Sequence, residues 1–245
     1  ATADTTGGFT LDTAAPDALT VALTEDTATA ADNISSNGAV TVTGSESGAT
    51  VEYSTDGGST WGSSFTASVG GNNVTVRQTD TAGNTSATTN LIFTLDTSAA
   101  APTVVLATDI GSASDDLITN DGSLTVTGET GATVEYSIDS GTSWGSSFAA
   151  TEGDNTVQVR QTDVAGNVSD ATTLTFTLDT TIAAPTVALT TDAGSSASDA
   201  ITNDGTLSVT DTETAATIEY SIDGTSWSAT APATDTAGAN TVLVR

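Results

Sequence analysis

The side chains of this chain that could do chemistry are carboxylates and amides. Its 245 residues include 31 Asp and Glu and only three cationic side chains, all Arg, with no His, Cys or Lys. The usual base of a serine nucleophile, a thiol nucleophile and a Schiff-base amine are therefore all missing. A pair of carboxylates could still act as acid and base, but the acidic residues recur once per repeat, and enzyme sites are seldom triplicated. We expect no enzymatic activity. The chemistry left to these oxygens is cation binding, above all of Ca²⁺, which takes about six to eight oxygen ligands.

The charge balance narrows the range of partners. The formal net charge is −28, which disfavours contact with nucleic acid and with anionic membrane surfaces and attracts cations. Charged residues make up only 14% of the chain and hydrophobic residues 36%, so a packed fold is expected rather than a disordered acidic tail. No apolar run is long enough to span a membrane. We predict no nucleic-acid partner and no membrane insertion.

A repeat of about 83 residues organises the sequence. Trp61, Trp144 and Trp227 are spaced by 83 and 83 residues, and the motif LDT recurs at 11–13, 95–97 and 178–180. The blocks VEYS, WGSSF, VRQTD and FTLDT occur in both of the first two copies, which are therefore close duplicates. We predict a last-strand segment at 1–11, full repeats at 12–95 and 96–178, and an incomplete repeat at 179–245 that lacks its last loop and last strand.

Within a repeat the apolar residues alternate with a period of two, which predicts strands with one buried face. Val134, Tyr136 and Ile138 share one face of such a strand, with Glu135 and Ser137 on the other. In the second repeat we place strands at 103–108, 123–127, 133–138, 155–162 and 172–178, with two more short strands within 143–151. The predicted fold class is all-β: tandem immunoglobulin-like antiparallel β-sandwich domains arranged head to tail as a rod, each about 40 Å long.

The topology of such a sandwich brings carboxylates to the junctions between repeats. The first and last strands run in the same direction, so the loop after the first strand lies beside the next linker, and the last loop of the following repeat lies there too. The first junction gathers Asp26, Asp32, Asp96, Asp163 and Asn167; the second gathers Asp109, Asp115, Asp116 and Asp179; the equivalent positions at the start of the first repeat are Asp12 and Asp80.

These residues predict Ca²⁺ at the inter-domain junctions. Carboxylates crowded at a hinge repel one another, and a divalent ion would neutralise and stiffen it; extracellular modules bind Ca²⁺ at roughly 10⁻⁴ to 10⁻³ M. The alternative is that Asp and Asn simply suit turns and hydrate loops. The segment SDDLITNDG (114–122) does not have the ligand spacing of an EF-hand.

Several phrases resemble a known family. Four phrases look like the bacterial Ig-like tandem repeats of giant secreted calcium-binding adhesins of the RTX type, which are often exported by type I secretion: LDTxAAPTVxL, SDxITNDGxLxVTG, GATVEYSIDxGTSW and VRQTDVAGNVS. The resemblance covers essentially the whole chain, and the phrase D-x-A-G-N is its most specific mark. It implies an extracellular stalk on a cell surface or in a biofilm matrix, with Ca²⁺ at the domain junctions. Neighbouring repeats would be the partners, and a surface glycan or receptor a possible further one.

Two other sets of residues have plain structural interpretations. Glu52 with Arg77, and Glu135 with Arg160, would form cross-strand pairs on an outer face, each contributing at most about 1 kcal/mol. The three tryptophans follow turns at equivalent positions and are expected to pack in the core or cap its edge. Exposed rings would instead favour an array of carbohydrate-binding modules. A phage or virion fibre domain is a further alternative, and it shares the same chemistry as the stalk.

The two ends of the sequence match the two sides of one missing loop. Residues 1–11 align with 85–95 without a gap, and restoring the seven residues QTD-x-AGN after Arg245 gives three repeats of 84. One interpretation is that the sequence is an excerpt of a longer covalent array. The other is that residues 5–11 of one chain fill the open groove in the third repeat of the next, giving a head-to-tail filament of copies.

Overall fold

The computed structural model describes residues 7–111, 113–214, 216–233 and 238–245, and every regular element in these residues is a β-strand. No helix among them is long and apolar enough to cross a membrane. The chain forms two compact units, one of residues 1–107 with 122–176 and the other of residues 108–121 with 177–245. Each β-sheet lies within one of the predicted repeats.

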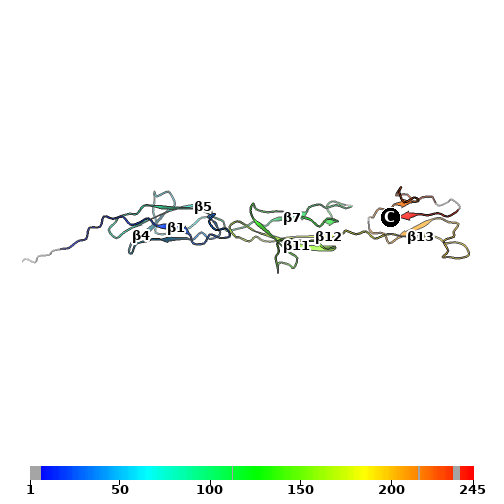
Figure 1. Ribbon diagram of the computed structural model, residues 1–245, viewed down its shortest axis with the longest axis horizontal. Helices are drawn as coiled ribbons and strands as arrows, with labels where there is room; N and C mark the ends of the chain where they lie inside the picture. The colour runs from blue at the N-terminus through cyan, green and yellow to red at the C-terminus, as the bar shows by residue number, and fades with distance from the viewer. Residues whose placement is uncertain (1–6, 112, 215, 234–237) are drawn as a thin grey trace, which may run out of the picture. The chain divides into compact units, whose positions relative to one another are not determined.

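The first repeat contains two sheets. Strand β1 (Thr20–Leu23) pairs antiparallel with β3 (Val40–Thr43). The second sheet has the order β2-β6-β5-β4, from β2 (Ile34–Ser35), β6 (Thr89–Leu95), β5 (Gly70–Thr79) and β4 (Thr50–Ser54). Strands β4, β5 and β6 are antiparallel to their neighbours, whereas the two-residue β2 runs parallel to β6. Figure 1 labels β1, β4 and β5 in this repeat.

Alternation along the strands builds the core between the two sheets. On β5, Val74 and Val76 are fully buried, and they pack with Phe93 of β6. Val21 of β1 and Leu19, which directly precedes β1, belong to the same cluster. Two sheets that face each other across one apolar layer form a β-sandwich. The predicted all-β, immunoglobulin-like fold class is therefore confirmed.

The second repeat repeats this arrangement. Strand β7 (Thr103–Leu106) pairs with β9 (Leu124–Thr127), and the larger sheet has the order β10-β11-β12-β8. Its strands are β10 (Thr133–Ser137), β11 (Gly153–Thr162), β12 (Thr172–Leu178) and β8 (Ile118–Thr119). Val157 and Val159 are fully buried and pack with Val104; Phe148 meets Phe176 edge-on, with ring centroids 6.2 Å apart.

The third repeat has fewer paired strands among its described residues. Strand β13 (Thr186–Leu189) pairs with β14 (Leu207–Thr210), and β15 (Tyr220–Ser221) pairs with β16 (Leu243–Val244). Both sheets are two-stranded, and no described strand takes the place that β6 and β12 hold in the other repeats. Val187 is 38% exposed here, whereas its equivalent Val104 is 7% exposed.

The predicted strands differ from the observed ones in two places. The two short strands expected within 143–151 are wrong: this segment makes only an isolated bridge, between Tyr136 and Gly145, and otherwise has no regular structure. Conversely, the parallel strands β2 and β8 were not predicted, because two residues are too short to show a period of two. The remaining strands of the second repeat lie within two residues of the expected bounds. Residues 7–11 of the predicted N-terminal strand segment make no strand of their own, and residues 1–6 lie outside the described residues.

A buried glutamine joins the two sheets of each full repeat. Gln161 is 1% exposed; its Oε1 accepts from the backbone N–H of Glu129 at 2.9 Å, and its Nε2 donates to the carbonyl of Ala100 at 2.7 Å. Gly128 makes room for it, because a Cβ there would lie 2.1 Å from Gln161 Oε1. Gln78 holds the same position in the first repeat and donates to Asp17 O at 2.7 Å. Both ends of the amide are thus satisfied inside the protein.

The turn after β10 is held by one carboxylate. Asp139 accepts from the backbone N–H of Ser143 at 2.9 Å, from the Ser143 hydroxyl at 2.5 Å and from the Ser137 hydroxyl at 2.8 Å. The side-chain hydrogen bond from Ser143, above all, lowers the pKa of Asp139 from 3.8 to about 2. The pKa values of Asp56 and Asp223, in the equivalent turns, are lowered as well.

We expect the second repeat to be destabilised without the first when its core is weakened. Val157→Ala removes two methyl groups from a fully buried position and should cost about 2 kcal/mol of unfolding free energy. Because packing is local to each repeat, the loss should fall on residues 103–178 only. Hydrogen exchange followed by mass spectrometry measures this segment by segment. The exposed neighbour Thr156→Ala is the control, and equal deprotection of 20–95 and 103–178 would contradict local packing.

The turn carboxylate gives a pH prediction. A lowered folded pKa means that the carboxylate form favours the folded turn, so this contribution is complete above the unfolded value of 3.8 and is lost as the pH falls through about 2. Carboxyl-carbon NMR titration of Asp139 should give a midpoint near 2 in the parent protein. In Ser143→Ala the midpoint should rise toward 3.8. A midpoint that does not move would show that Ser143 is not the cause.

Candidate functional site at the junctions between repeats

The D-x-A-G-N loop, residues 163–167 in the second repeat, is closed by its own first and last side chains. Asp163 accepts from the backbone N–H of Asn167 at 2.8 Å with one carboxylate oxygen and from Asn167 Nδ2 at 2.8 Å with the other. Asn167 Nδ2 also donates to the carbonyl of Asp96 in the linker, at 2.9 Å. Asn167 therefore holds the loop between β11 and β12 against the linker. We call this arrangement of Asp163, Asn167 and the Asp96 carbonyl the clasp.

The first repeat has the same clasp. Asn84 Nδ2 donates to Asp80 at 2.9 Å and to the carbonyl of Asp12 at 3.3 Å. The side-chain hydrogen bond from Asn84, above all, lowers the pKa of Asp80 below its usual value of 3.8. The Asn84 amide thus bridges the predicted residues Asp12 and Asp80: it binds the backbone carbonyl of Asp12 and the carboxylate of Asp80.

The D-x-A-G-N loop of the second repeat also contacts the upstream repeat. The Thr27 hydroxyl donates to the carbonyl of Ala165, and Ala165 itself is fully buried. A Cβ at Gly166 would lie 3.5 Å from Ala28 Cβ, and Gly166 has a φ of +89°, so glycine suits both the turn and the close approach. Segments 138 residues apart in the sequence are joined at this junction.

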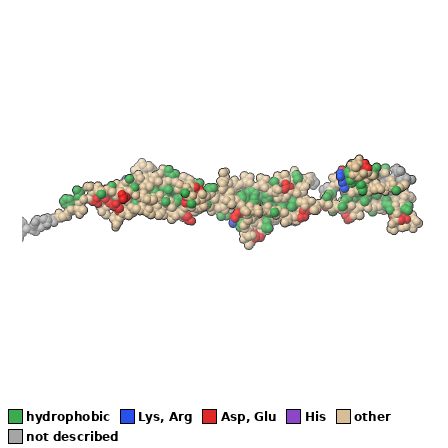
Figure 2. Space-filling model, in the orientation of Figure 1, with side chains coloured by type: hydrophobic (Ala, Val, Ile, Leu, Met, Phe, Trp, Pro, Cys, Tyr) green, Lys and Arg blue, Asp and Glu red, His purple; other side chains and the backbone are tan. Residues whose placement is uncertain are grey.

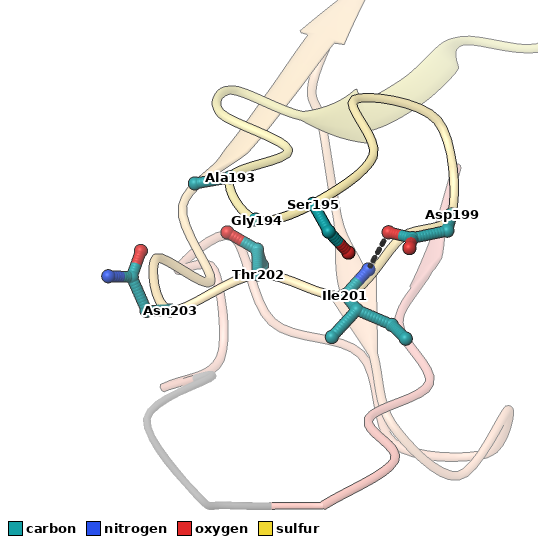
Figure 3. A pocket seen from close by; sticks show the side chains of 7 residues that line it. All are labelled: Ala193, Gly194, Ser195, Asp199, Ile201, Thr202 and Asn203. Carbon is teal, nitrogen blue, oxygen red and sulfur yellow. Dashed lines mark hydrogen bonds between the residues drawn. The ribbon is translucent and has the colours of Figure 1, made fainter.

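The upstream loop is shaped by two aspartates that recur in each repeat. Asp32, Asp116 and Asp199 each accept from the backbone N–H two residues later, at 2.9, 3.1 and 3.1 Å. Figure 3 shows this bond for Asp199 and Ile201 in the loop of the third repeat, together with Ser195 and Thr202. These bonds turn the chain into β2, β8 and the corresponding segment of the third repeat.

The second recurring aspartate leaves one oxygen unsatisfied. Asp26, Asp109 and Asp192 use Oδ2 to accept from Asn33, Leu117 and Ala200 at 3.4, 3.2 and 3.0 Å. The three residues whose backbone N–H groups donate all have positive φ, between 55° and 58°. The Oδ1 atoms of the same aspartates are buried, and in the described part of the chain they have no hydrogen-bond partner. A polar atom left unpaired at the same position of three repeats calls for a water or an ion.

The predicted metal residues thus meet only in part. Asp96 N donates to the Ser35 carbonyl at 3.0 Å, and the Ser35 hydroxyl donates to Glu25 O at 2.8 Å, so the linker lies against the Asp26 loop. At the second junction Asp179 N donates to Thr119 O at 2.9 Å. Yet no three carboxylates converge to hold a metal anywhere within residues 7–111, 113–214, 216–233 and 238–245. Asp115 is exposed. Acidic side chains occupy several separate places on the visible face in Figure 2.

Each tryptophan lies half-buried on an outer face beneath an arginine. The guanidinium carbons of Arg77, Arg160 and Arg245 lie 4.0, 4.1 and 4.1 Å from the ring centroids of Trp61, Trp144 and Trp227. The same arginines pair with Glu52, Glu135 and Glu219 at 2.8, 2.9 and 2.7 Å. The indole N–H groups of Trp61 and Trp144 donate to glycine carbonyls at 3.0 and 3.1 Å. The sequence predicted the ion pairs of the first two repeats, but neither the pair of Glu219 with Arg245 nor the cation–π contacts.

Comparisons with known proteins give little further guidance. No protein-family model and no curated protein matches the chain. Among solved structures, the chain is similar to fibronectin(III)-like modules of Clostridium thermocellum CbhA, with 18% identity, a TM-score of 0.31, and coverage of 58% of this chain and 84% of that one.

The clasp can be tested by removing its donor. Asn167→Ala leaves the carbonyl of Asp96 and the carboxylate of Asp163 without their amide partner and should cost about 1 to 3 kcal/mol of unfolding free energy. The backbone N–H of Asn167, which Asp163 holds, should exchange faster with solvent. Chemical denaturation and amide exchange measure the two effects. The matched control is Asn90→Ala, since Asn90 is exposed and pairs only with the Thr75 hydroxyl at 3.0 Å. Equal losses of unfolding free energy in the two variants would show that the clasp has no special role in stability.

Proposed function

We propose that this chain is a structural, adhesive stalk or fibre segment, made of Ig-like repeats that act as an extracellular spacer on a cell surface or in a biofilm matrix. The observation that carries this proposal is the junction, where Asn167 ties the linker and Thr27 of the upstream repeat donates to Ala165. In this chain the D-x-A-G-N motif holds the linker and the upstream repeat in place, and a repeat built in this way is suited to transmitting position and force. The resemblance of its motifs to secreted bacterial adhesin repeats supports the same role.

Ca²⁺ belongs to this proposal as the stiffening ion. The buried, unpaired Oδ1 atoms of Asp26, Asp109 and Asp192 fit a hard cation, which is satisfied by carboxylate and carbonyl oxygens together. At the first junction Asp26 would be the anchoring ligand, with Asp32 and Asp96 on adjoining segments. Since three carboxylates do not converge, backbone carbonyls and water would complete the coordination. The ion would supply a positive charge where a chain of net charge −28 brings loops together.

The outer-face tryptophans favour the spacer over a carbohydrate-binding array. A sugar platform needs a free ring face, whereas an arginine about 4 Å from the centroid covers one face of each ring. The ring also lies close to the preceding turn: a Cβ at Gly58 would lie 3.3 Å from the Trp61 ring. Each stack therefore serves to hold a turn against the sheet.

The calcium proposal predicts a site-specific gain in stability. With a dissociation constant of roughly 10⁻⁴ to 10⁻³ M, 10 mM Ca²⁺ should stabilise each occupied repeat by about 1.4 to 2.7 kcal/mol. The melting temperature in 10 mM CaCl₂ should therefore exceed that in chelator. The triple variant Asp26→Asn, Asp109→Asn, Asp192→Asn should lose this gain, because each buried carboxylate becomes a neutral amide.

The control removes the same charge elsewhere. Asp17→Asn, Asp170→Asn and Asp211→Asn change one exposed aspartate in each repeat, so non-specific screening by Ca²⁺ falls by the same amount in both triple variants. Only the first triple variant should lose the calcium response. If both variants respond like the parent protein, or if the parent does not respond to calcium, these aspartates are not calcium ligands. The spacer role would then rest on the clasp alone.

A further inference from the structure

The turn that follows the edge strand of the larger sheet also covers the open side of that strand. In the second repeat the edge strand is β10, which has β11 on one side and no described strand on the other. Tyr136 N–H donates to the carbonyl of Gly145 at 2.8 Å, and Gly145 N–H donates to the carbonyl of Tyr136 at 2.9 Å. Because backbone groups alternate between the two sides of a strand, Val134 and Tyr136 are the residues of β10 that face outward, and the turn occupies one of them.

The same cover occurs in the other two repeats. Tyr53 exchanges both of its backbone hydrogen bonds with Gly62, each at 2.8 Å. Tyr220 does so with Ser228, at 2.8 and 3.0 Å. Each pair is an isolated bridge outside the named strands, and so short a pairing is marginal in water. Other contacts must therefore hold the segment in place.

A stack of side chains supplies those contacts. Trp144 directly precedes Gly145, and its Nε1 donates to the carbonyl of Gly141 at 3.1 Å. The guanidinium carbon of Arg160, on β11, lies 4.1 Å from the centroid of the Trp144 ring. Arg160 lies opposite Glu135 of β10 in the sheet register and pairs with its carboxylate at 2.9 Å. The arginine therefore reaches across the edge strand and holds the tryptophan on its far side.

An open edge strand would be a particular hazard for this chain. Unpaired backbone groups at a sheet edge pair readily with another strand. The sequence TVEYS forms both β4 and β10, so one repeat offers the next a matching edge. Misassembly between domains is a characteristic failure of repeat proteins. Ile138, which directly follows β10, is 75% exposed and adds apolar surface at this edge.

We propose that this segment is an edge cover: an autoinhibitory contact, clamped by the Arg–Trp stack, that stops the larger sheets from pairing edge to edge between repeats or between copies of the chain. The edge covers are residues 57–62, 140–145 and 224–228. Arg160 then has a second role beside its ion pair, since its guanidinium holds Trp144 and thereby keeps Gly145 on Tyr136. This inference does not depend on the calcium site or on the stalk role.

Gly145→Pro tests the edge cover, because proline has no N–H to donate to the Tyr136 carbonyl. Gly145→Ala is the matched control: a Cβ there would meet only Ser147 O, at 3.9 Å, and the third repeat has Ser228 at the same place. In Gly145→Pro the Tyr136 amide should exchange with solvent roughly tenfold faster than in Gly145→Ala, as expected for the loss of one hydrogen bond.

The freed edge should then pair with other strands. High salt screens the repulsion between chains of net charge −28. Under this condition Gly145→Pro should self-associate as its concentration rises in sedimentation velocity, and Gly145→Ala should associate no more than the parent. Adding Ile138→Lys to Gly145→Pro should abolish the association, because a lysine beside an edge opposes strand pairing. Adding Val105→Lys should not, since Val105 is 54% exposed but lies on β7, in the other sheet.

Three results would overturn the proposal: equal exchange of the Tyr136 amide in the two variants of Gly145, no association once that amide is freed, or association that the two lysine substitutions suppress alike. Protection of the Val157 amide in the same exchange experiment reports whether the second repeat stays folded. Where Gly145→Pro loses that protection, Trp144→Ala takes its place with the same expected outcomes, since it removes the clamp and keeps every backbone N–H.

Discussion

The structure depends on satisfying backbone groups of segments that leave the sheets. The linker and the start of the first strand run along the edge of each repeat, where their carbonyls have no strand partner. Side-chain amides take that place: Gln161 donates to Ala100 O at 2.7 Å and Asn167 to Asp96 O at 2.9 Å. Gln161 is 1% exposed, and leaving its buried amide without an acceptor would cost about 1 to 3 kcal/mol, a large share of the stability of a domain this small. Two amides therefore fix the path of the linker.

This fixed path determines the junction. Once Asn167 holds the linker, the D-x-A-G-N loop lies against the upstream loop, and Gly166 admits the backbone near Ala28. The clasp belongs to the downstream repeat, and the first repeat carries the same amides, with Gln78 donating to Asp17 O and Asn84 to Asp12 O. Duplication of one unit therefore reproduces the means of joining it to the next, which is the property that repeat proteins need in order to lengthen.

The sequence was sufficient for the fold because burial alternates strictly along the long strands. On β11, every second residue from Asn155 to Gln161 is buried. The two valines among them, Val157 and Val159, make this alternation visible in the sequence. The same logic failed at 143–151, where Gly, Ser and Ala give no alternation and only one bridge forms. The segments that carry Asp26, Asp96 and Asp163 do lie at one junction, as topology predicted, while the role of these residues as metal ligands stays a prediction. The use of Asn167 as a clasp could not be foreseen, since it depends on the distance from a side-chain amide to a backbone carbonyl.

The chain carries many carboxylates, and several of those in turns accept hydrogen bonds from neighbouring residues of the same turn. Asp139 and Asp80 accept hydrogen bonds from their own loops, and their lowered pKa values express that stabilisation of the charged form. Such carboxylates have little need of a cation. The Oδ1 atoms of Asp26, Asp109 and Asp192 differ, because they are buried without a donor in three equivalent loops. Burying a charged oxygen unpaired is costly. The proposed Ca²⁺ would offset that cost and would also reduce the repulsion of a −28 chain, so the proposal ties the stiffness of the junction to the ionic composition around it.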